Sequence, residues 1–196
     1  IVFAAATSPT SSSPIQYVLA DPTLSAGSHP TSERPTRPRM WTWQARVQTL
    51  PANNRLVITE ASHSGAVHAF SSLVRTYEFA RRTYGDRYGR TLVAWLGYEV
   101  EWGCGSCFSR VPVNALGQSF ATQLWIGDTA ADQRHWASAV TAHEVGHWLM
   151  DSYGVSPGEG GTHYVGIPTY PGQAWSEGFA TFVSSQQRGD PVYVDK

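Results

Sequence analysis

The stretch of this chain with the clearest chemistry is residues 143–147, which read His-Glu-Val-Gly-His. Apolar residues around it recur at three- and four-residue spacing, which predicts a helix over about 132–154. On a helix, residues four apart project from one face, so His143 and His147 can both reach one metal ion. Glu144 lies about 100° around the axis from His143, unsuited as a third ligand but close enough to take a proton from an activated water. The spacing predicts a catalytic zinc site; the alternative is a helix whose two histidines pair with buried carboxylates.

Catalytic zinc commonly has three protein ligands, so the pattern requires one more. Asp151 lies one turn beyond His147, too far along the helix to complete the coordination comfortably. His163 follows a glycine-rich loop and can in principle reach the metal. Glu177 stands in the first turns of a second predicted helix, which stops at Gly189. On spacing alone, His163 and Glu177 both remain open as the third ligand.

The motif at 143–147, followed on a later helix by Ser-Glu-Gly-Phe-Ala at 176–180, resembles the gluzincins. This group includes the thermolysin-like proteases and the aminopeptidases related to leukotriene hydrolase. The resemblance implies that Glu144 is the general base of peptide hydrolysis. It also implies a Zn²⁺ ion with three protein ligands: His143, His147 and Glu177.

Peptide hydrolysis further requires a donor for the oxyanion of the tetrahedral intermediate, a Tyr or His in related enzymes. His163 and Tyr164 are the predicted catalytic residues for this role, and Tyr153 and Tyr170 are further candidates. The stretch Ser119–Ile126 resembles the edge strand along which gluzincins bind an extended peptide through main-chain hydrogen bonds. The partner expected from these features is a peptide or protein substrate.

Periodicity in the rest of the chain predicts an α+β domain. We expect strands over 41–47, 55–59, 91–98 and 119–126, a turn at 51–54, and a helix over 65–84 that ends at Gly85. Together with the resemblance, this order predicts a zincin-like domain. It would have a small mixed sheet, an active-site helix and a following glutamate-bearing helix.

The N-terminal part of the chain has a different composition. Residues 7–38 contain 12 Ser or Thr and 6 Pro, which predicts an extended segment without a helix of its own. We therefore expect an extended Ser/Thr/Pro-rich segment over 1–39 and a metallopeptidase domain over 40–196. Because the sequence begins Ile-Val-Phe-Ala-Ala-Ala, its first six residues are interpreted as the end of a removed targeting or anchoring segment.

Charge and cysteine content restrict the function classes. The formal net charge of -1 argues against a nucleic-acid partner bound through a basic patch. No apolar run reaches the roughly 20 residues that a membrane-spanning helix needs. Cys104 and Cys107 are interpreted as a small disulfide loop, with two free thiols as the alternative, and they are too few for a four-cysteine zinc site. A disulfide would place the protein outside the cell or in the cell envelope.

Two functions follow from these patterns. The first is a secreted zinc metallopeptidase, with an endopeptidase favoured because the Gly-x-Met-Glu-Asn strand of the exopeptidases is missing. The second is a non-catalytic binding or assembly subunit that retains the gluzincin fold and zinc site. In thermolysin-like enzymes a helical domain after the third ligand completes the cleft. The residues after Glu177 do not match such a domain, which favours the binding subunit unless a partner chain or the 7–38 segment completes the cleft.

Overall fold

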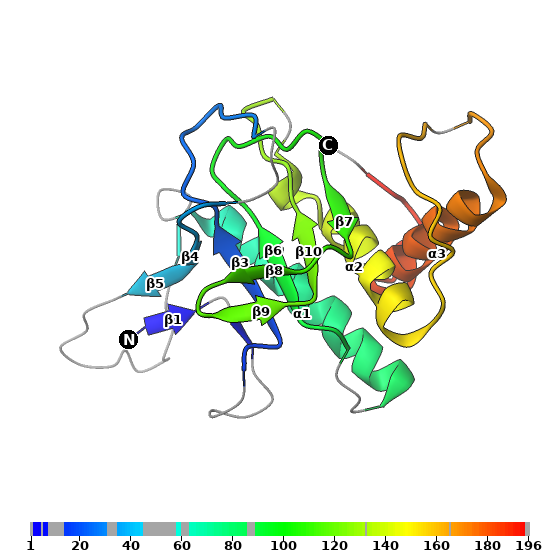
Figure 1. Cartoon of the computed structure of the whole chain (residues 1–196), viewed down its shortest axis with the longest axis horizontal. Coiled ribbons are helices and arrows are strands. Elements are labelled where there is room, and N and C mark those ends of the chain that lie inside the picture. Colours follow the sequence, from blue (N-terminus) through cyan, green and yellow to red (C-terminus); the bar gives the residue numbers. More distant parts are fainter. Residues whose placement is uncertain are drawn as a thin grey trace.

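The computed structural model describes residues 2–4, 6–7, 14–30, 35–44, 58–59, 63–85, 89–131, 133–164 and 166–194. In this part of the chain the molecule is α+β, with a mixed sheet beside long helices (Figure 1), as the periodicity predicted. The turn expected at 51–54 and most of the strand expected over 55–59 lie outside the described residues.

The main sheet has the strand order β2-β3-β6-β10-β7, and β4 pairs with β3. Its strands are β2 (Ala6–Thr7), β3 (Tyr17–Asp21), β4 (Arg39–Met40), β6 (Leu92–Trp95), β7 (Cys107–Ser109) and β10 (Thr122–Trp125). The three central strands β3, β6 and β10 are parallel, whereas β2, β4 and β7 pair antiparallel with their neighbours. Two smaller sheets pair β1 (Val2–Ala4) with β5 (Thr42–Gln44) and β8 (Val113–Ala115) with β9 (Gln118–Phe120).

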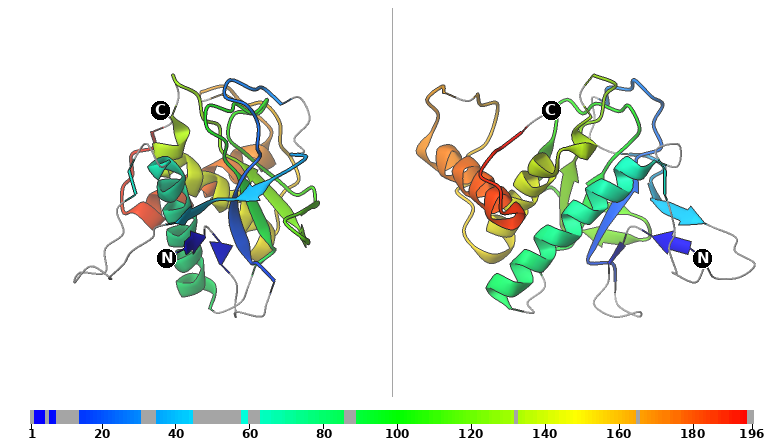
Figure 2. Two further views of the ribbon diagram at one scale, coloured as in Figure 1. Left: turned by 90° about the vertical axis from the view of Figure 1, so that its left-hand side faces the viewer. Right: turned by 180° about the vertical axis from the view of Figure 1, so that it is seen from behind.

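The central strands are buried on both faces, because alternate side chains enter two separate cores. Helices α1 (Ser64–Tyr84) and α2 (Ser138–Tyr153) cover one face of the sheet (Figure 2), where they meet Leu19 and Ala94. The other face holds Val18, Val93 and Trp95, with residues of the β8–β9 hairpin packed against them. Of the strand predicted over 91–98, residues 92–95 form β6, which lies between the two cores.

Strand β3 comes from within the segment expected to be an extended tail. Residues 17–20 are fully buried, and β3 pairs in parallel with β6. Part of the Ser/Thr/Pro-rich stretch thus belongs to the central sheet of the folded molecule.

The stretch Ser119–Ile126, predicted as one strand at the edge of the sheet, divides between β9 and β10, and the edge position is wrong for β10. Strand β10 lies between β6 and β7, and all four of its residues are buried. Its polar side chains suggested exposure, but they are satisfied internally: the amide of Gln123 accepts a hydrogen bond from the indole of Trp95 and donates one to the carbonyl of Val111. The edge strand next to β10 is β7, which pairs antiparallel with it.

Cys107, the first residue of β7, forms a disulfide with Cys104 in the loop before the strand. This confirms the disulfide interpretation. The alternative of two free thiols is wrong, since neither cysteine is free. Among the described residues, no helix combines the length and the hydropathy needed to cross a bilayer.

Candidate metal centre

The two parts of the motif, residues 143–147 and 176–180, lie on two helices that pack side by side. Helix α3 (Pro171–Arg188) packs against α2 outside the sheet (Figure 1). A proline in its first turn suits the start of a helix, and Gly189 ends it with φ 65° in the left-handed conformation. The helices approach closely at Gly146, where a Cβ atom would lie 2.8 Å from Cα of Ala180. The glycine within the histidine motif therefore brings α3 close to α2.

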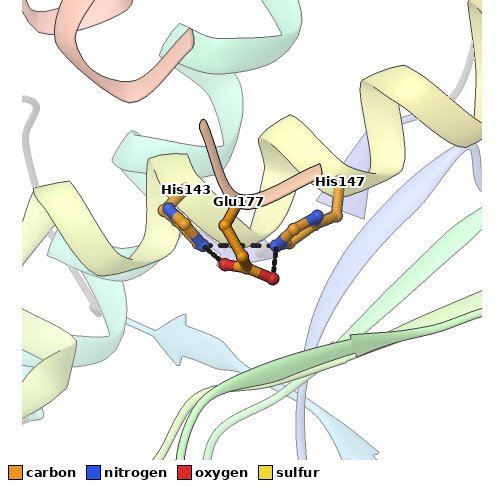
Figure 3. A group of neighbouring side chains, drawn as sticks. All are labelled: His143, His147 and Glu177. Atoms are coloured by element: carbon orange, nitrogen blue, oxygen red, sulfur yellow. Dashed lines mark hydrogen bonds and ion pairs between the residues drawn. The ribbon is translucent and has the colours of Figure 1, made fainter. Parts of the chain in front are cut away.

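This approach brings His143, His147 and Glu177 together, and Figure 3 shows both imidazoles facing the carboxylate. The two Nε2 atoms are 3.2 Å apart. Glu177 Oε2 is 3.0 Å from Nε2 of His143, and Glu177 Oε1 is 3.5 Å from Nε2 of His147. The potential ligand atoms all lie within 4.8 Å of one another.

The geometry of these donors fits a tetrahedral zinc site. Zinc–nitrogen and zinc–oxygen bonds of about 2.0–2.2 Å place neighbouring ligand atoms roughly 3.3 Å apart. Nε2 of His143 lies 3.0 Å from Glu177 Oε2 and 3.2 Å from Nε2 of His147, both close to that value. The 3.5 Å separation involves His147 and the other carboxylate oxygen, Oε1. Two imidazoles and one carboxylate are also a common protein donor set of catalytic zinc, which leaves one position open.

Hydroxyl groups on α3 orient both imidazoles. Ser176 Oγ lies 3.0 Å from Nδ1 of His147, and Thr181 Oγ1 lies 3.2 Å from Nδ1 of His143. When each Nδ1–H donates to its hydroxyl, each Nε2 carries a lone pair directed toward the other ligands. Helix α3 thus supplies one potential ligand and the hydrogen bonds that orient the other two.

Contacts within this group shift the pKa of Glu177 and the pKa of His147. Burial alone would raise the pKa of Glu177, but hydrogen bonds from His143 and His147 and the positive charge of both rings hold it far below its usual range. Burial alone would lower the pKa of His147. The hydrogen bond to Glu177 and the negative charges of Glu144 and Glu177 nevertheless raise it. The site is therefore strongly polar although it is largely buried.

The remaining predicted site residues lie at different distances from this group. Glu144 is buried on α2, near enough to His147 for its charge to act on that ring. His163 reaches the site from the loop before α3, with Nε2 3.3 Å from Glu177 Oε2 and Nδ1 3.0 Å from the carbonyl of Gly161. Tyr164 is 66% exposed.

Asp151, considered above as a possible ligand, is held elsewhere. Its carboxylate forms an ion pair with Arg90 at 2.8 Å, and its side chain is largely buried. Tyr153 likewise packs away from the metal ligands, stacked on Tyr84.

Two aromatic residues that sequence reasoning missed lie against the histidines. The ring of Phe108, on β7, stacks on His147 at a centroid distance of 6.5 Å. The ring of Tyr193 meets His143 at 5.5 Å. Neither belongs to a metal-binding motif, and only the sheet topology and the path of the chain after α3 bring them to the site.

Comparison with known proteins gives one match, to a family model that covers part of the chain. A family model described as the mycolysin C-terminal domain matches residues 115–196, and this domain occurs in thermolysin-like metalloproteases. The matched range includes α2, α3 and all three potential metal ligands. Neither a curated protein nor a solved structure matches the chain.

Proposed function

We propose that this protein is a zinc-dependent peptidase, with endopeptidase activity favoured. The observation that carries the proposal is the convergence of His143, His147 and Glu177 around one position, with Glu144 beside it on the same helix. A structural zinc site is typically closed by four protein ligands and does not require an adjacent carboxylate. The match to a domain that occurs in thermolysin-like metalloproteases supports a relationship to that family and carries no information on catalysis by this chain.

The proposed roles follow from where the side chains lie. His143, His147 and Glu177 would hold the zinc, which in such open sites activates water and polarises a carbonyl group. Glu144 would accept the proton of the attacking water and later deliver it to the leaving amine. His163, which contacts Glu177, would donate to the developing oxyanion.

Strand β7 is the proposed binding site for the peptide main chain. Among the described residues it pairs only with β10, so its other side can accept an extended segment. The stacking of Phe108 on His147 places this strand beside the metal ligands. Main-chain pairing of this kind tolerates many peptide sequences, which suits an endopeptidase.

Secretion is the proposed location. The Cys104–Cys107 disulfide is compatible with an oxidising compartment, and so is the relationship to the mycolysin domain.

A non-catalytic binding subunit is the second candidate. Trp175 and Phe182 expose large apolar surfaces on α3, which suits contact with a partner protein. At about 100° per residue, both side chains lie on the face of α3 opposite Glu177, so a partner bound there would leave the candidate metal site uncovered.

The two functions are separated by incubating the protein with a quenched fluorescent peptide library. We expect cleavage that stops with a zinc chelator and returns when zinc is restored. Glu144→Gln should retain about one zinc per chain and lose nearly all cleavage. Wild-type protein that binds zinc and cleaves no peptide would contradict the peptidase and favour the binding subunit.

A further inference from the structure

We infer that Arg110 selects peptides that carry an acidic side chain, an inference that rests on the proposed binding of a peptide along β7. Arg110 directly follows Ser109, the last residue of this strand. Its side chain is exposed and makes no ion pair or hydrogen bond within the described part of the chain. A guanidinium presents its N–H donors in a planar fork that matches a carboxylate. The structure thus has a positive charge available to a ligand at the end of the proposed peptide-binding strand.

Arg110 lies on the same side of the sheet as the candidate metal centre. Phe108 pairs with Leu124, a residue of the core beneath the helices, and its ring stacks on His147. Residues two apart on an extended chain project to the same side, so the side chain of Arg110 follows that of Phe108. Its guanidinium accordingly lies beside the loop after α2, where Nη2 is 3.8 Å from the position of a Cβ at Gly158.

The loop after α2 connects Arg110 to the metal centre. It carries His163, whose Nε2 is 3.3 Å from Glu177 Oε2. It also carries Glu159, whose carboxylate accepts the backbone N–H of Gln173 in the first turn of α3. Glu159 and Arg110, both described, form no ion pair with each other. The charge of Arg110 is therefore not neutralised by the acidic residue of this loop.

The main chain on both sides of Arg110 is held in place. Ser109 pairs with Gln123 of β10, and its Oγ accepts the backbone N–H of Val111 at 3.1 Å. The carbonyl of Val111 accepts the side-chain amide of Gln123 at 2.8 Å. A charged group on a fixed main chain loses less conformational freedom when a ligand binds. Arg110 combines such a main chain with an unpaired side chain.

The strand geometry assigns the acidic side chain to one position of the peptide. Side chains directly opposite one another in paired strands lie on one face, with Cβ atoms about 4.5–5.5 Å apart. The peptide residue opposite Arg110 is therefore two positions from the residue opposite Phe108. A glutamate there can accept two parallel N–H bonds from the guanidinium, whereas a glutamine has only one acceptor oxygen.

The first test compares cleavage of quenched fluorescent peptides of alanine and serine with one glutamate, or one glutamine, at each position in turn. We expect glutamate to raise kcat/KM about fivefold over glutamine at one position relative to the cleaved bond, the upper range for a partly exposed charge pair. Arg110→Gln should abolish this preference, and Arg110→Glu should replace it by a preference for lysine. Arg82→Gln, at an exposed arginine on α1, is the control and should keep the preference for glutamate.

The distribution of the preference along the peptide is also decisive. A similar gain from glutamate at every position would indicate general attraction of negative charge and overturn selection by Arg110. A preference that persists in Arg110→Gln would overturn it as well.

Peptide binding to the Glu144→Gln protein separates this inference from the proposed peptidase activity. Calorimetric titration with the unlabelled peptides measures affinity without cleavage. Tighter binding of the glutamate peptide, lost when Arg110→Gln is added, would support selection by Arg110 even if the wild type cleaves no peptide. Equal affinities for the glutamate and glutamine peptides at every position would overturn it even if the wild type is an active peptidase.

Discussion

The ring of Tyr193 lies 5.5 Å from the ring of His143, inclined at 61°, so the chain returns to the candidate metal site after α3 has ended. This return is held by Arg188, whose guanidinium donates to the carbonyls of Asp190 and Val192. The carboxylate of Asp190 also accepts the backbone N–H of Val192. A short C-terminal segment, seen beside α2 in Figure 2, thereby forms part of the wall of the site.

Replacing Tyr193 tests whether this contact orients His143. Tyr193→Phe keeps the ring and is expected to keep zinc affinity. Tyr193→Ala removes the packing partner and should weaken zinc binding about tenfold, the low end for residues that orient ligands. Competition with a fluorescent chelator measures the affinity. Equal affinities in wild type and Tyr193→Ala would contradict the orienting role.

The hydroxyls on α3 provide a second prediction. Thr181→Val removes the group 3.2 Å from Nδ1 of His143 and should weaken zinc binding about 10–100-fold. Ser176→Ala should act similarly through His147. Thr181→Ser keeps a hydroxyl at the same position and is the matched control. If the valine and serine variants bound zinc equally, the hydroxyl at 181 would have no orienting role.

The pKa shifts predict how the zinc-free protein responds to pH. The pKa of Glu177 is lowered, so its contribution to stability is present above its ordinary value of 4.5 and is lost as the pH falls below it. The pKa of His147 is raised, so its contribution is present below its ordinary value of 6.5 and is lost as the pH rises through the folded value. Both contributions are therefore present between about pH 4.5 and 6.5.

Glu177→Gln tests this coupling in the zinc-free protein. It removes the hydrogen bond and charge that raise the pKa of His147, so that pKa should fall, as measured by NMR titration of the imidazole. Zinc requires unprotonated His147, so in wild type the stabilisation by zinc should increase between pH 6 and 8 as the proton leaves. An unchanged His147 pKa in Glu177→Gln would show that the carboxylate does not control it.

Much of the candidate site could be predicted because its chemistry depends on local spacing. Residues four apart on a helix must share a face, so His143 and His147 followed from periodicity alone. Glu177 followed from the resemblance of the second motif, since nothing in spacing determines how two helices separated by a loop will pack. The contacts of Phe108 and Tyr193 depend on sheet order and on the chain after α3, for which the sequence has no periodic signal.

The fold shows the same division between local and long-range information. Helix α1 was expected over 65–84 and is observed over Ser64–Tyr84, because a long amphipathic pattern is read locally. Strand β3 was missed because its short apolar run lies among serines, threonines and prolines, whose average suggested an extended tail. The position of β10 was misjudged because internal hydrogen bonds of Gln123 cannot be distinguished from solvation by residue type.

Gly146 provides the sharpest test of how α3 is placed. Alanine in a helix interior is normally favoured over glycine by about 1 kcal/mol, but a Cβ at position 146 would lie 2.8 Å from backbone Cα of Ala180. Since backbone cannot give way as a flexible side chain does, Gly146→Ala should separate the helices and destabilise the protein by about 1–3 kcal/mol. Zinc affinity should fall with it, because Glu177 would move away from both imidazoles.

Gly178→Ala, on α3 with nothing within 4 Å of its Cβ, is the control and should be neutral or stabilising. Denaturant unfolding and zinc titration measure both effects, and equal behaviour of the two variants would contradict close packing at Gly146 as the cause of the site's geometry.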